Sequence, residues 1–149
     1  MAKSAQAPAA PDTQERDARS RLHGRAGWTL LALGLLFGVT LEALEAFRVS
    51  WIVADAWRNR LWSLAHFHAE AMGLLNLVYG PWAGALPDAS ARTASRVLVI
   101  GSALLPLGFV LGGLAHPEGD PGIGILLTPV GAALVISVAV RQAIRAWRS

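Results

Sequence analysis

Ionisable side chains interrupt an apolar segment of the chain, LWSLAHFHAEAMGLLNLVYG. His66, His68 and Glu70 lie in the first half of that segment, and the preceding apolar segment carries Glu42 and Glu45. Imidazole and carboxylate groups together bind zinc, iron or manganese, and helical bundles build such sites from Glu and His side chains on facing helices. Glu42, Glu45, His66 and His68 are therefore candidate ligands of a transition metal ion or a haem.

The helical period decides which of these side chains can converge on one point. His66 and Glu70 are four residues apart and share a helix face, as do Glu42 and Glu45 at a spacing of three. His68 lies about 200° around the helix from His66. We therefore expect His68 to contact a different neighbouring helix or a second subunit, so that a haem would be held by one histidine or shared between two copies of the chain.

Two other interpretations of the same residues remain open. An ionised group inside a bilayer costs a few kcal/mol on insertion scales, so it faces a protein interior or water. Pairing of Glu42 or Glu45 with His66 would then act as an internal lock in a non-catalytic subunit of a larger membrane complex. A proton or ion pathway is the third interpretation, and it needs polar residues in the inner half, where the chain offers little beyond Asn76 and Thr128.

The remaining polar residues are interpreted as structural. His23 is expected to be interfacial, His116 to lie in a loop, and the hydroxyls of Ser102, Thr128 and Ser137 to bond to carbonyls of their own helices. The chain has no cysteine, no Gly-rich phosphate loop, no nucleophile elbow and no HExxH motif. No catalytic residue is assigned.

The composition indicates that these residues belong to a membrane protein. Of the 149 residues, 54% are hydrophobic and only 15% are charged, compared with about 25% charged in soluble domains. The 13 basic residues flank apolar segments, a pattern that indicates orientation in a bilayer rather than binding of nucleic acid.

Four apolar segments are long enough to cross a bilayer and predict an all-α fold, an integral membrane four-helix bundle. The expected spans cover residues 26–47, 61–79, 97–115 and 123–140, within a bundle of residues 26–149, and a flexible cytoplasmic tail covers residues 1–25. Residues 48–60 are expected to include a short interfacial helix. Gly80 and Pro81 are expected to end the second span, because proline disfavours a helical predecessor.

The arginines predict the orientation. The tail, the second loop and the C-terminus hold all the basic residues except Arg48, Arg58 and Arg60, which lie in the first loop. The positive-inside rule then predicts a multi-pass protein of the inner (cytoplasmic) membrane with both termini cytoplasmic. In this orientation Glu42 lies about 24 Å along the first span and His66 about 7 Å into the second, which matches their depths in the outer half of the bilayer.

Two GxxxG pairs predict close helix contacts. Gly34 with Gly38, and Gly108 with Gly112, provide the small-residue spacing that lets membrane helices approach each other. They predict a homo-oligomer or a place in a larger membrane complex. The lipid bilayer is the other expected partner.

The chain resembles small four-span bacterial membrane proteins that have no assigned activity. The resemblance rests on LEALEAFRVSW and LWSLAHFHAEAMGLLNL, which together make up under a third of the 149 residues. It implies a polar core between the first two spans and implies no reaction. Those relatives have a small or polar residue at the position of Glu70, so the resemblance implies no ligand there. The HxH pair is also similar to pairs in respiratory oxidases and their accessory proteins, which is compatible with a redox complex.

Overall fold

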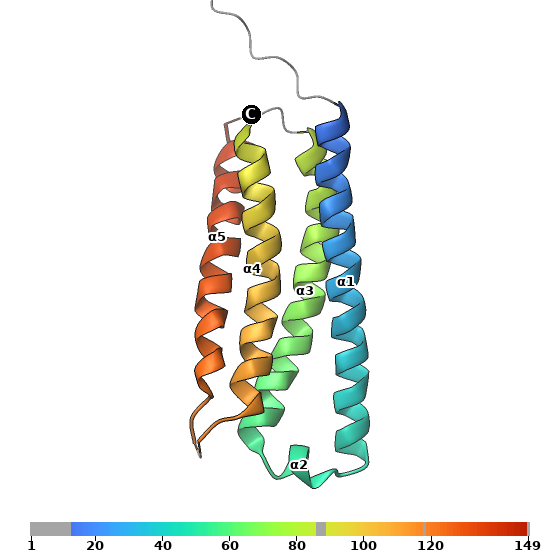
Figure 1. The fold of residues 1–149 in the computed structure, drawn as a ribbon, viewed down its shortest axis with the longest axis vertical. Helices are drawn as coiled ribbons and strands as arrows, with labels where there is room; N and C mark the ends of the chain where they lie inside the picture. The colour runs from blue at the N-terminus through green and yellow to red at the C-terminus, as the bar shows by residue number, and fades with distance from the viewer. Residues whose placement is uncertain (1–12, 86–88, 118, 149) are drawn as a thin grey trace, which may run out of the picture.

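The computed structural model describes residues 13–85, 89–117 and 119–148, which are mostly helical and form no strand. Four long helices stand side by side in the order α1, α3, α4, α5, and each runs antiparallel to the next (Figure 1). Their bounds are Thr13–Ala46 for α1, Ala56–Ala85 for α3, Ala89–Leu114 for α4 and Leu127–Ala146 for α5. The short helix α2 (Ser50–Val53) links α1 to α3, and the 3₁₀ helix η1 (Ile123–Leu126) leads into α5. The predicted all-α fold is confirmed.

Three helical stretches of the described chain are long and apolar enough to cross a membrane: Thr13–Ala46, Ser90–Leu114 and Ile123–Ala146. The remaining long helix, α3, has 30 residues but is less apolar, because His66, His68, Glu70 and Asn76 lie within it. The sequence predicted four apolar spans, and three helices meet that description.

Helix α1 begins earlier than the sequence predicted. Its first residue is Thr13, so the second half of the predicted flexible tail is helical, whereas residues 1–12 lie outside the described residues. Arg19 and His23, one turn apart, are 5% and 0% exposed. The early start of α1 therefore follows from packing of this turn against the neighbouring helices.

Helix α3 also ends later than predicted. It passes through Gly80 and Pro81 and continues to Ala85. The extra turn places Ala83 in a buried apolar cluster with Tyr79, Leu98 and Val138. Burial of this turn offsets the hydrogen bond that proline removes from a helix.

Glycines bring α1 and α3 into backbone contact. A Cβ on Gly27 would lie 2.9 Å from the carbonyl oxygen of Gly73, and a Cβ on Gly73 would lie 2.8 Å from the backbone nitrogen of Leu31. No side chain larger than hydrogen fits at either position without movement. Further along the same interface, Gly34 and Gly38 pack against side chains of α3.

The predicted GxxxG pairs are therefore used inside the chain. Gly34 contacts Glu70, Gly38 contacts His66, and Gly112 contacts Ile125. Gly108 packs against the first residues of α5. The homo-oligomer through these glycines stays a prediction.

The connection between α1 and α3 is closely built and contains the short helix that the sequence predicted. Arg48 adopts a left-handed conformation with φ 51°. Its N–H donates to the Glu45 carbonyl, and the N–H of Val49 donates to the Leu44 carbonyl. This pair of bonds is the Schellman motif that ends many helices, with arginine at the position usually taken by glycine.

Candidate functional site

The predicted ligands on α1 point away from the protein interior. The side chains of Glu42 and Glu45 are exposed. His66 is half-buried on α3, and a Cβ placed on Gly38 would lie 3.0 Å from its Cδ2 atom. Glu70 packs one turn further along against Gly34. The predicted shared face of His66 and Glu70 is thus the face that α3 turns toward α1.

His68 lies on the other side of α3, as its spacing predicted. Its ring packs at 4.9 Å from that of Phe109 on α4. Its Nδ1 atom lies 2.7 Å from the Leu64 carbonyl oxygen. Because a carbonyl only accepts, Nδ1 is the donor.

The predicted ligands therefore do not share one centre within a single chain. In the part of the chain that the structure describes, no group of three or more His, Asp or Glu side chains is placed to hold a metal ion. The reason is rotational. The members of each pair share a helix face as predicted, but α1 turns Gly27, Gly34 and Gly38 toward α3 and its carboxylates outward.

A different set of polar residues is buried together, nearer the end of the molecule where α1 begins. His23 on α1, Asn76 on α3 and Ser102 on α4 are each 0% exposed. His23 Nδ1 lies 2.8 Å from Asn76 Oδ1, and Asn76 Nδ2 donates to Ser102 Oγ at 2.8 Å. We call these three residues the polar network.

The geometry fixes the direction of these hydrogen bonds. Asn76 Nδ2 also donates to the Met72 carbonyl oxygen at 2.8 Å, which identifies it as the amide nitrogen. Asn76 Oδ1 is then an acceptor, so His23 Nδ1 is the donor. The His23 Nε2 atom is left as a buried acceptor with no hydrogen-bond partner among the described residues.

Tyr79 extends the polar network to α5. Its ring packs edge-on against that of His23, with centroids 4.8 Å apart. Its hydroxyl accepts a hydrogen bond from Gln142 Nε2 at 2.8 Å. Side chains from all four long helices therefore meet near this end of the molecule.

Charged residues contact one another at the opposite end of the molecule, near the connection that contains α2 (Figure 1). Asp55 caps the start of α3 by accepting the Arg58 backbone N–H at 2.9 Å. Its other oxygen lies 3.0 Å from both Arg58 Nη1 and His116 Nε2. Asp55, Arg58 and His116 form what we call the ionic cluster.

The ionic cluster also contacts backbone and aromatic groups. Arg58 Nε donates to the Gly113 carbonyl at 3.0 Å, and its guanidinium lies 4.4 Å from the ring of Trp51. Trp62 donates its indole N–H to the Val110 carbonyl at 3.1 Å. These contacts join the start of α3 to the end of α4.

The surroundings of Asp55 favour its charged form. The Arg58 backbone N–H is the largest influence on the pKa of Asp55 and lowers it; the nearby Arg58 and His116 side chains lower it further, each by less. Partial burial is the second-largest influence and raises the pKa, but the lowering effects together exceed it.

Sequence reasoning missed both groups of residues. His23 was interpreted as interfacial and Ser102 as bonded to its own helix, but both are buried and linked through Asn76. Thr128 likewise reaches the Leu105 carbonyl of α4, and only Ser137 bonds within its own helix. A usable signal existed for Asn76, because an amide deep in an apolar helix requires partners on neighbouring helices.

Comparison with known proteins adds no relative. No family model matches the chain, and no similar curated protein or solved structure was found. Fold and site together define an all-α protein with three helices of membrane-spanning length, whose buried polar side chains bond to one another between helices.

Proposed function

We propose that this protein is a four-span integral membrane protein of the inner membrane that acts as a non-catalytic subunit of a larger membrane assembly. The observation that carries the proposal is the use of the buried polar groups. His23, Asn76 and Ser102 bond to one another across three helices instead of converging on a cavity. Such bonds fix the order and rotation of helices, which is a structural use of these groups.

The packing of α3 supports the proposal that it also crosses the membrane. It lies between α1 and α4 (Figure 1), in backbone contact with α1 at Gly73. At 30 residues it is about 45 Å long, enough to cross a bilayer. Its Asn76 and His66 face α1, so much of its polarity is directed toward protein.

The positive-inside rule supports cytoplasmic termini. Arg58 was an exception to that rule, and the ionic cluster supplies a different reason for it: the arginine pairs with Asp55 at 3.0 Å. The chain has no cysteine, so single cysteines can report orientation directly. In intact cells an impermeant maleimide should label Ser50→Cys and not Thr13→Cys. The reverse labelling would contradict the orientation.

A proton pathway between α1 and α3 fits the packing less well. Polar residues do exist on both sides of the interface centre, with Asn76 nearer one end and Glu70 and His66 nearer the other. Between them, Gly27 and Gly73 bring the two backbones into contact. This contact interrupts any continuous polar route along the interface.

Mild solubilisation of native membranes tests the assembly role. The wild-type chain should migrate in a complex larger than its 15.7 kDa monomer in a micelle. Asn76→Leu should weaken incorporation because it breaks the polar network, whereas the exposed control Ser137→Ala should not. A wild-type chain that migrates only as a monomer would contradict the proposal.

Binding of a metal ion or haem between two chains is the second candidate. The observation that favours it is the contact of His68 Nδ1 with the Leu64 carbonyl. Such a contact orients a metal-binding histidine, which would bind the metal through Nε2. Exposed Glu42 and Glu45 could complete such a site only from another chain. Metal analysis and an absorption spectrum of wild type, His66→Ala and His68→Ala decide between the candidates. A bound metal or a Soret band that disappears in His68→Ala would favour the second.

A further inference from the structure

We infer that the protein binds one anionic phospholipid in the space between α1 and α4, with its phosphate near the start of these helices and its acyl chain along them. The inference rests on the membrane location proposed above and is independent of the assembly role. Two features between the same pair of helices support it: a basic pocket and an apolar groove.

The basic pocket lies between the first turns of α1 and α4. It has a volume of about 180 Å³ and is lined in part by Arg19, Arg92 and Arg96. Glu15 also lines it and pairs with Arg92 at 3.4 Å. Three positive charges against one negative charge leave a net charge of +2, which favours an anion.

A buried hydroxyl group distinguishes this pocket from a solvated patch of arginines. Ser95 lines the pocket, is 1% exposed, and its Oγ has no hydrogen-bond partner among the described residues. A buried polar atom without a partner is uncommon in folded proteins. A phosphate oxygen in the pocket would accept a hydrogen bond from this hydroxyl.

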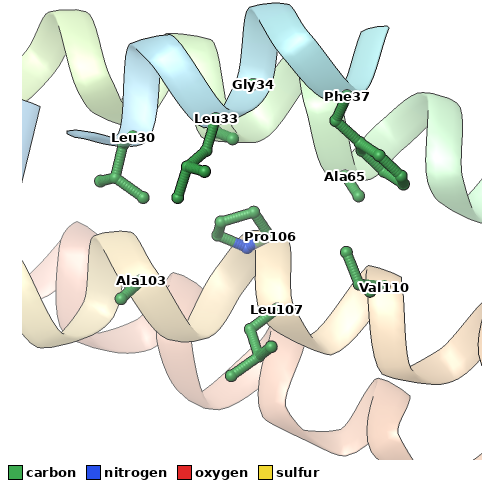
Figure 2. Close-up of a pocket in the computed structure, with 10 residues that line it drawn as sticks. Leu30, Leu33, Gly34, Phe37, Ala65, Ala103, Pro106, Leu107 and Val110 are labelled. Atoms are coloured by element: carbon green, nitrogen blue, oxygen red, sulfur yellow. The ribbon is translucent and has the colours of Figure 1, made fainter. Parts of the chain in front are cut away.

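The apolar groove lies further along the same two helices, toward their middle. Its volume is about 440 Å³, and α1 and α4 form its walls with α3 behind them. Figure 2 shows Leu33 of α1 facing Pro106 of α4 across the groove, with Phe37 and Val110 at its far end. The lining is almost wholly apolar.

The dimensions fit a lipid. From Arg96 to Val110 the rise along α4 is about 21 Å, close to one leaflet of hydrocarbon plus its headgroup layer. The groove is lined by residues 30–37 of α1 and 103–110 of α4, a length of about 10 Å. An acyl chain that starts at the basic pocket can lie along this length.

Lipid binding can be measured on the full chain in an uncharged detergent by native mass spectrometry. Phosphatidylglycerol should bind at least tenfold more tightly than phosphatidylcholine with the same acyl chains. Glycerol phosphate, which has a phosphate but no acyl chains, should bind far more weakly than phosphatidylglycerol. Equal binding of the two lipids, or equal binding of glycerol phosphate and phosphatidylglycerol, would overturn the inference.

Matched variants locate the headgroup. Arg96→Gln should weaken phosphatidylglycerol binding about fivefold, whereas Arg25→Gln, an exposed arginine of α1 outside the pocket, should change it less than twofold. Ser95→Ala should weaken binding without lowering the thermal stability of the lipid-free protein. Glu15→Gln should strengthen it. Equal effects of Arg96→Gln and Arg25→Gln would indicate general attraction to charge and overturn the site.

A second pair of variants locates the acyl chain. Ala103→Trp should fill the groove and reduce binding of phosphatidylglycerol, whereas Ala133→Trp, at an exposed position of α5, should not. Melting temperatures of the lipid-free variants check that both fold. Unchanged lipid binding by folded Ala103→Trp would overturn the inference.

Discussion

The two ends of the molecule are held together by different chemistry. Near the start of α1, the polar network of His23, Asn76 and Ser102 uses neutral groups that are 0% exposed. At the α2 connection, the ionic cluster uses charged groups, and the Asp55 side chain is 23% exposed. Both sets of contacts bridge helices that are distant in sequence.

The difference follows from access to water. A charge in a dry interior carries a large desolvation cost, whereas a neutral amide or imidazole needs only to have its hydrogen bonds satisfied. Near the connection, partial exposure lowers the desolvation cost and also weakens each ion pair. Loss of a polar-network residue should therefore destabilise the fold more than loss of a charge in the ionic cluster.

The largest effect is expected at Asn76. Asn76→Leu would remove the acceptor of His23 Nδ1 and the donor to Ser102 Oγ, and would leave a buried imidazole N–H unpaired. We expect a loss of about 2 kcal/mol in unfolding free energy. Reversible unfolding in mixed micelles measures it. Ser137→Ala, whose hydroxyl is exposed, should cost less than about 0.5 kcal/mol, and an equal cost for both variants would contradict the role of the polar network.

A smaller effect is expected at Asp55, where two substitutions separate its two roles. Asp55→Ala removes both the helix cap and the charge, and should cost about 1–2 kcal/mol. Asp55→Asn can still accept the Arg58 N–H and removes only the charge, so it should cost about half as much. Unfolding of both variants under the same conditions gives the comparison. An equal loss for both would show that the cap contributes little.

The charge of Asp55 also predicts a pH dependence. Its pKa in the folded protein is lower than the value of 3.8 that it has when unperturbed. Its stabilising contribution is therefore complete above pH 3.8 and is lost as the pH falls through the lower folded-state pKa. The difference in melting temperature between wild type and Asp55→Asn should narrow below pH 3.8. A difference that stays constant down to pH 2 would contradict this assignment.

The smallest effect is expected at Arg48, which lies in the connection between α1 and α3. Its φ of 51° suits glycine better than a residue with a Cβ. Arg48→Gly should raise the unfolding free energy by about 0.5–1 kcal/mol. Arg48→Ala keeps the strained conformation and removes the charge, so it should leave stability nearly unchanged. A gain in Arg48→Ala equal to that in Arg48→Gly would assign the effect to charge.

The sequence by itself determined the local features. Apolar segments predicted the helices, a short helix was expected in the first connection, and a spacing of two residues predicted that His68 would face away from His66. These features depend on chain-local geometry, namely the rise and period of one helix and the exclusion of charge from apolar surroundings. The predicted placement of Glu42 and Glu45 opposite His66 also depended on the rotation of one helix against another, which chain-local geometry does not determine.

Only the tertiary structure decided which faces meet. Each helix can turn about its own axis without changing its sequence pattern, and the choice depends on how all helices pack at once. Here the contact of Gly27 with Gly73 sets the rotation of α1 against α3. That rotation brings His23 to Asn76 and leaves Glu42 and Glu45 exposed. Glu42 and Glu45 therefore lie apart from His66, because close backbone packing, rather than attraction between His and Glu side chains, fixes the α1–α3 interface.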